Sequence, residues 1–124
     1  MASQSLDITL KLSSDSKING ILNLNSTEND TLTFDDTDVV ANSVTVAHGA
    51  ATVVVASAVS TATYVYIKNT DVTNFCDLKN DAGNVWGILH PGEFIFFCVN
   101  PSDGFEIQAN TASCVVDYVT FKKG

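Results

Sequence analysis

The chain has 124 residues, 14 of them acidic and six basic, and its formal net charge at pH 7 is −8. This length predicts one domain spanning residues 1–124, with enough hydrophobic residues to build a core without disulfides or metals. The basic residues are all lysines, and nothing resembles a cationic patch. We therefore expect no nucleic-acid partner and no binding to an anionic membrane surface.

The first third of the chain predicts strands separated by polar segments. Leucine and isoleucine alternate with polar residues over positions 6–12, and this period of two predicts a strand with one face in water. Residues 18–24 predict a second strand. Residues 25–30 are all polar and predict a loop, and residues 32–34 predict a short strand.

The middle of the chain predicts a β-hairpin. Residues 40–46 alternate as a strand, and the dipeptide His48-Gly49 follows. A short link that ends in glycine between two β-rich segments is typical of a hairpin turn. Residues 51–59 would form the returning strand.

The C-terminal half predicts strands at short, regular intervals. In residues 64–68 the two tyrosines share a face with Lys68, and Val65 and Ile67 face the other way. Pro91-Gly92 predicts a tight turn. Further strands are predicted at residues 74–79, 85–89, 93–99, 105–109 and 114–121. Strand-length segments with turn signals between them, and no helical periodicity, predict an all-β, antiparallel β-sandwich or barrel.

Candidate catalytic residues are few. Each of Cys76, Cys98 and Cys114 lies in an apolar strand-like segment, which predicts buried thiols and folding in a reducing compartment. The spacing of these cysteines from His48 and His90 supports neither a nucleophile pair nor a zinc site. The first residues do not resemble a signal peptide. We expect a protein that is not an enzyme and uses no cofactor.

An acidic segment between residues 28 and 38 raises the possibility of calcium binding, because calcium takes oxygen ligands. Its spacing does not match an EF-hand loop, and a solvated acidic segment is the simpler interpretation. The carboxylates in question are Glu28, Asp30, Asp35, Asp36 and Asp38.

Aromatic side chains are concentrated after residue 63, where they would form core or interface, or line a sugar-binding face. The segment Phe94-Ile-Phe-Phe97 places apolar side chains on both faces of one strand. Because a small sandwich has one interior, we expect a second subunit to cover one of these faces.

Two segments resemble small structural proteins of tailed bacteriophages of the cyanophage and marine phage type. These are Tyr64-Val-Tyr-Ile-Lys-Asn-Thr-Asp71 with Thr73-Asn74, and Leu89-His-Pro-Gly-Glu-Phe94. The resemblance covers the C-terminal half and includes no catalytic motif. It implies a jelly-roll sandwich that decorates or cements a capsid, or that sits in the tail and fibre apparatus, assembled in the host cytoplasm.

On this resemblance the partners are the major capsid protein and further copies of the chain, as a trimer on the capsid exterior. Candidate interface residues are Tyr66, Trp86, Phe94 and Phe96. The alternative is a carbohydrate-binding module of a tail or fibre. No catalytic, cofactor or metal residue is predicted.

Overall fold

The computed structural model describes residues 3–13, 25–35, 39–57, 63–100 and 102–122. Within these ranges the chain forms ten β-strands, and no helix that could cross a membrane is found there. The strands are β1 (Ser3–Ser13), β2 (Asn25–Asp35), β3 (Val39–Val46), β4 (Thr52–Val55), β5 (Thr63–Asn69), β6 (Cys76–Lys79), β7 (Val85–Leu89), β8 (Phe94–Val99), β9 (Phe105–Ala109) and β10 (Cys114–Lys122).

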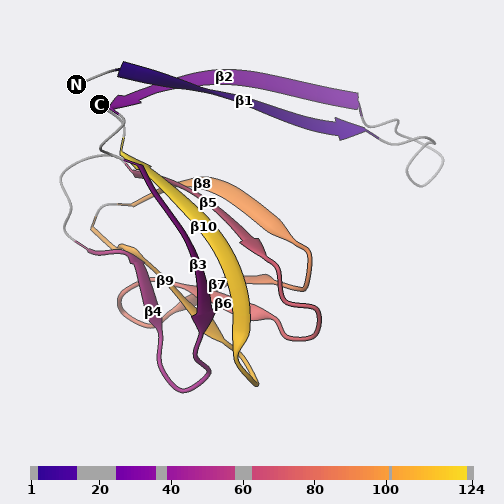
Figure 1. Cartoon of the computed structure of the whole chain (residues 1–124), viewed down its shortest axis with the longest axis vertical. Helices are drawn as coiled ribbons and strands as arrows, with labels where there is room; N and C mark the ends of the chain where they lie inside the picture. The colour runs from indigo at the N-terminus through magenta and orange to yellow at the C-terminus, as the bar shows by residue number, and fades with distance from the viewer. Residues whose placement is uncertain (1–2, 14–24, 36–38, 58–62, 101, 123–124) are drawn as a thin grey trace.

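Eight of these strands form two antiparallel four-stranded sheets that pack face to face (Figure 1). The first sheet has the order β3-β10-β5-β8 and the second has the order β4-β9-β6-β7. The chain crosses between the sheets repeatedly, so that, apart from the consecutive pair β6 and β7, neighbours in a sheet are not consecutive in sequence. This strand order is that of a jelly roll, and the predicted all-β sandwich is confirmed.

The core fills the space between the two sheets with one face of each strand. In β5, β9 and β10 buried residues alternate with more exposed ones, as the pleat of a half-buried strand requires. The largest fully buried side chains include Phe105, Ile67, Leu78 and Ile107. Each such side chain contributes about 1.5–3 kcal/mol by leaving water, so the sandwich needs no disulfide.

The hairpin predicted at His48-Gly49 is wrong. β3 belongs to one sheet and β4 to the other, so the link carries the chain across the sandwich instead of joining paired strands. The returning strand is also shorter than predicted, because β4 ends at Val55. A glycine turn between two β segments indicates only that the chain changes direction there. Which strands pair depends on the sheet that each strand joins, and β3 and β4 join different sheets.

The loop predicted at residues 25–30 is also wrong, because these residues begin β2, which pairs with β1 along its whole length. Polar cross-strand contacts hold this part of the hairpin: Thr9 donates to Asn29 at 2.9 Å and Thr31 donates to Asp7 at 2.9 Å. Both faces of β2 at residues 27–30 are exposed, so the hydrophobic alternation that marks a strand is missing. The strand predicted at residues 18–24 lies outside the described residues.

The β1–β2 hairpin forms its own sheet outside the sandwich. It crosses the outer face of the β3-β10-β5-β8 sheet and extends beyond the body on the side where β8 lies (Figure 1). Leu32, on β2, is buried, and Leu6 and Ile8 on β1 are half-buried. The near half of the hairpin therefore packs on the sandwich.

Candidate assembly surface

The outer face of the β3-β10-β5-β8 sheet carries a cluster of aromatic side chains. Tyr64 and Tyr66 point outwards from β5, beside Phe94 and Phe96 of β8. The rings meet diagonally across the two strands: the centroids of Tyr64 and Phe96 are 5.9 Å apart, and those of Tyr66 and Phe94 are 6.3 Å apart. We call these four residues the aromatic face.

The aromatic face is only partly covered. Phe94 is 63% exposed, and the other three side chains of the aromatic face are half-buried. Aromatic rings gain stability by leaving water, and contiguous exposed apolar surface on a monomer marks a contact site. The alternate residues of β8 point inwards: Ile95 and Phe97 pack against the core, and Val99 is part of it. One face of β8 thus packs in the core, and its other face is free to contact another protein.

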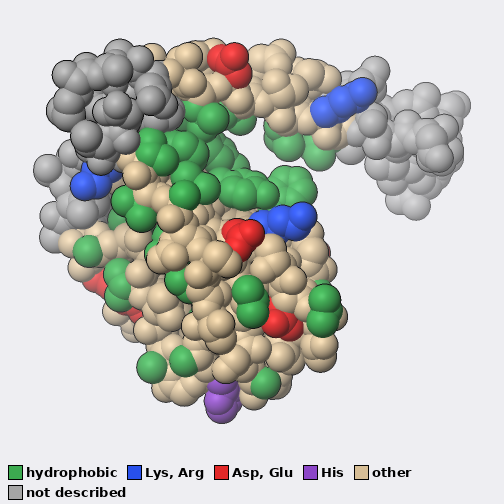
Figure 2. Space-filling view, viewed as in Figure 1, with side chains coloured by type: hydrophobic (Ala, Val, Ile, Leu, Met, Phe, Trp, Pro, Cys, Tyr) green, Lys and Arg blue, Asp and Glu red, His purple; other side chains and the backbone are tan. Residues whose placement is uncertain are grey.

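A groove of about 590 Å³ runs between the hairpin and this face of the sheet. Leu6, Ile8 and Leu10 form its upper wall, and Figure 2 shows hydrophobic side chains gathered beneath the hairpin. The opposite wall is formed by Tyr66, Phe94, Ile95, Phe96, Val119 and Phe121. The groove is predominantly apolar, so it fits a nonpolar protein surface better than a charged ligand.

Of the four predicted interface residues, Tyr66, Phe94 and Phe96 lie together and Trp86 lies elsewhere. A β-bulge in the pairing of β6 with β7 places Trp86 against core rings, with its ring centroid 5.1 Å from that of Phe97 and 5.8 Å from that of Phe105. Trp86 also lines a second cleft, of about 600 Å³, on the open side of the sandwich between β7 and β8. Phe94 borders both spaces.

Sequence reasoning missed Leu10 and Leu12 as surface residues. They are 50% and 46% exposed, although their alternation predicted one buried face. Their cross-strand partners, Glu28 and Ser26, are polar and were assigned to a loop. Aligning the polar residues 25–30 as a strand opposite Leu10 and Leu12 would have predicted this hairpin, with leucines that no apolar partner covers.

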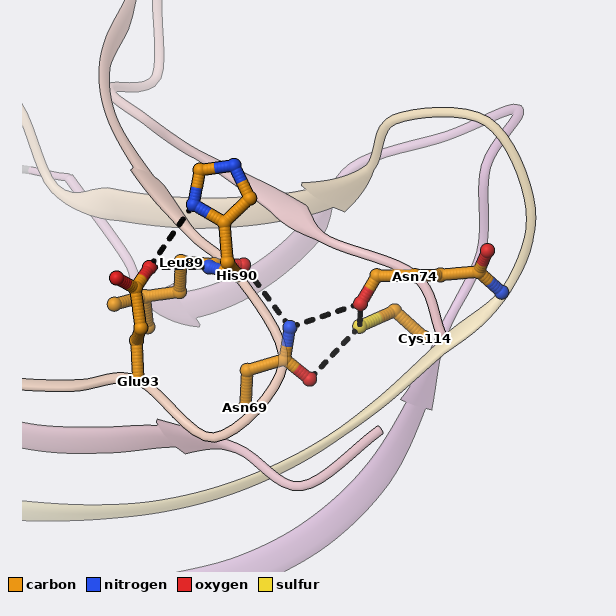
Figure 3. Close-up of polar contacts among 6 residues, drawn as sticks. All are labelled: Asn69, Asn74, Leu89, His90, Glu93 and Cys114. Carbon is orange, nitrogen blue, oxygen red and sulfur yellow. Dashed lines mark hydrogen bonds and ion pairs between the residues drawn. The ribbon is translucent and has the colours of Figure 1, made fainter. Parts of the chain in front are cut away.

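Next to the aromatic face, a buried asparagine joins three segments of the chain (Figure 3). The Asn69 amide donates to the carbonyl oxygens of Asn74 at 3.0 Å and Leu89 at 2.9 Å. Its Oδ1 accepts from the Cys114 thiol at 3.2 Å and from the Asp71 amide at 2.9 Å. All hydrogen-bonding positions of this side chain are used, so it acts as a structural clamp.

The same region does not have the arrangement of a cysteine nucleophile. The His90 ring turns towards Glu93, with Nδ1 3.1 Å from Oε1, and not towards Cys114 (Figure 3). Burial raises the pKa of Cys114, which keeps the thiol protonated and unreactive. Burial, followed by the neighbouring Cys114, raises the pKa of Cys76 to about 12.

The third cysteine corrects one prediction: Cys98 is exposed on the outer side of β8, whereas Cys76 and Cys114 are buried. Its place on an outward position of an edge strand explains the difference. The acidic segment offers no assembled cation site within the described ranges, where no group of three potential metal ligands is found. Asp36 and Asp38 lie outside those ranges.

No protein-family model matches the sequence, and no curated protein matches it. One solved structure with a similar fold is described as Bacillus endospore appendages that form a family of disulfide-linked pili. That match covers 70% of this chain and 87% of the other, at 18% identity and a TM-score of 0.46. A match this distant assigns neither family nor function.

Proposed function

We propose that this chain is a structural subunit that works by associating with other protein surfaces, including further copies of itself. The observation that carries the proposal is the aromatic face, with Phe94 63% exposed at the mouth of an apolar groove. Burying one exposed phenylalanine contributes about 2 kcal/mol, and a cluster of four aromatic residues with the groove beside it provides several such contributions.

We propose further that the assembly is a virion and that the chain cements or decorates the exterior of a capsid. The support is the resemblance of two segments to phage structural proteins. These segments meet through two backbone hydrogen bonds: the backbone N–H of Asn69 donates to Glu93 O at 2.9 Å, and the backbone N–H of Gly92 donates to Asn69 O at 2.8 Å. The partners would then be the major capsid protein and two further copies in a trimer, assembled in the host cytoplasm.

The carbohydrate-binding alternative has weaker support. A hollow of about 350 Å³ brings Trp86 near Asn80, Asn100 and Asp103, which is a composition that sugar sites use. The Asn80 Oδ1, however, accepts from the backbone amides of Ala82 and Asn84, and the Asn100 amide donates to Asp103. These polar atoms already stabilise turns, which leaves fewer of them for sugar hydroxyls.

Replacement of Phe94 tests the proposal. We expect Phe94→Lys to weaken self-association about tenfold or more in sedimentation velocity, because it places a charge in an apolar contact. The control is Val72→Lys, at a loop residue that is 91% exposed and outside the aromatic face. A wild-type chain that stays monomeric at all concentrations and ignores purified capsids would contradict the proposal.

Counting copies on particles tests the virion assignment separately. A cement protein should co-purify with phage particles at a copy number comparable to that of the major capsid protein. A few copies per particle would favour the tail. Binding on a glycan array that is lost in Trp86→Ala would favour the carbohydrate alternative.

A further inference from the structure

The four edge strands of the sandwich differ in how they are protected from pairing with another chain. β4 and β7 are short, and each has an irregular register with its neighbour. β3 and β8 pair regularly with their neighbours, and their sequences contain neither proline nor a charged residue. Proteins normally blunt exposed edges with bulges, charges or proline. Both edges of the β4-β9-β6-β7 sheet are therefore protected, and both edges of the β3-β10-β5-β8 sheet are unprotected.

We infer that β8 of one copy pairs antiparallel with β3 of the next copy, so that the β3-β10-β5-β8 sheet continues from subunit to subunit. The inference rests on the proposed function and names its partner and contact. Each neighbouring pair in this sheet is antiparallel, so β3 and β8 run in opposite directions. A second copy placed beside the first in the same orientation presents its β3 antiparallel to β8.

Charge also favours a second copy at this edge. The chain carries a net charge of −8, so most approaches of two copies bring like charges together. Because β3 and β8 contain no charged residue, pairing along them puts no like charges opposite each other in the ladder. The contact is heterologous, and it forms a ring if the rotation between copies closes or a filament if it does not.

The projecting end of the hairpin fits this arrangement. The hairpin extends past the β8 side of the body (Figure 1). Leu12, next to the last residue of β1, is 46% exposed. From Ile8 to Leu12 the strand advances ~13 Å, which is between two and three strand spacings of ~4.8 Å. The end of the hairpin that carries Leu12 is thus long enough to reach over the added copy, whose edge strand β3 has the small, exposed outward residues Ala41, Ser43 and Thr45.

Cys98 provides a built-in reporter for the contact. It is exposed on the outer side of β8, so a cysteine on the outer side of a neighbouring β3 can come within about 4.5–5.5 Å of it, Cβ to Cβ. Single replacements Ala41→Cys, Ser43→Cys and Thr45→Cys scan the possible registers. Asn42→Cys is the matched control, because residue 42 pairs with buried Tyr118 and points to the other face.

Under oxidised glutathione, we expect at least one of the three outward variants to give a ladder of dimers and larger species on non-reducing gels. The ladder should disappear when Cys98→Ala is added, and Asn42→Cys should not form it. Dimers that form in the wild-type chain through Cys98 alone would overturn the inference in favour of β8 pairing with β8. Sedimentation on the same samples tests the proposed function separately. If the chain assembles but no variant cross-links, the β8–β3 pairing is wrong and the proposed assembly function stands.

A charge on the edge gives a second measurement that does not depend on oxidation. Ser43→Lys should reduce assembly in sedimentation by roughly tenfold, as edge lysines do in natural sheets. Ser102→Lys, at an exposed turn residue, is the control. Unchanged assembly in Ser43→Lys would contradict the inference.

Discussion

Asn69 illustrates how a single polar side chain can hold several segments of a β-sandwich. It is fully buried, yet its amide and carbonyl bond Asn74, Leu89, Asp71 and Cys114. A buried amide is tolerated in a core only when its partners are present, and here they come from the ends of several strands. The residue fixes the turn that leads into β8 and thereby the position of Phe94.

We expect Asn69→Ala to lower the free energy of unfolding by about 2–4 kcal/mol, because it removes the donor to the Leu89 carbonyl oxygen, one donor to the Asn74 carbonyl oxygen, and the acceptor of the Asp71 amide. Chemical denaturation measures the loss. Asn110→Ala is the control, since that exposed amide bonds Asp77 at 3.2 Å and its removal should cost less than about 0.5 kcal/mol. Equal losses for the two variants would contradict the role given to Asn69.

Among the elements, the connection between β8 and β9 depends on one glycine. Gly104 has a φ of +67°, and a Cβ there would lie 2.8 Å from Val55 O and 2.9 Å from Ser57 N. Both contacts are with backbone at the end of β4, so nothing flexible can move aside. The glycine lets the β8–β9 turn pass close to β4 at this corner of the sandwich.

Gly104→Ala should therefore destabilise the fold by about 2–4 kcal/mol, from the left-handed conformation and the steric clash together. The comparison is Gly83→Ala: its φ is +86°, but its surroundings are open within 4 Å. That variant should lose only about 1–2 kcal/mol, from conformation alone. Thermal or urea unfolding of both variants gives the difference, and a larger loss at Gly83 would refute the steric explanation.

Local pattern predicted the strands and faces of the C-terminal half well. Tyr64 and Tyr66 face outwards and Val65 and Ile67 inwards, as alternation indicated, because β5 is buried on one side only. Prediction failed for the polar residues of β2, where neither face is buried and cross-strand pairing alone makes the strand. The sequence also did not show that Trp86 lies apart from the other three interface candidates, since a bulge changes which face a residue occupies and leaves no mark in the alternation.

At the scale of the whole molecule, net charge and apolar surface act in opposite directions. A charge of −8 keeps copies apart, whereas the aromatic face and the open edges of the sheet favour association. The contacts proposed for assembly contain few charges, so ion pairs do not hold them together. Screening the net charge should then favour assembly.

Raising the ionic strength from about 0.01 M to 0.15 M shortens the Debye length from ~30 Å to ~8 Å. We expect self-association of the wild-type chain, measured by sedimentation, to strengthen over this range. Phe94→Lys should show weaker association at every salt concentration. Association that weakens as salt is added would indicate that ion pairs hold the copies together, and would count against an apolar interface.

The sequence by itself determined that the chain folds as strands with one buried face, because alternation and turn residues act over a few neighbouring positions. Tertiary structure decided which strands are partners, since β10 pairs with β3 and β5, both far from it in sequence. It also decided that Cys98 and Phe94 are exposed and that Leu10 and Leu12 are about half exposed. Whether a side chain is exposed depends on which distant segment packs over it. That packing is a long-range contact, and the pattern of neighbouring residues does not predict it.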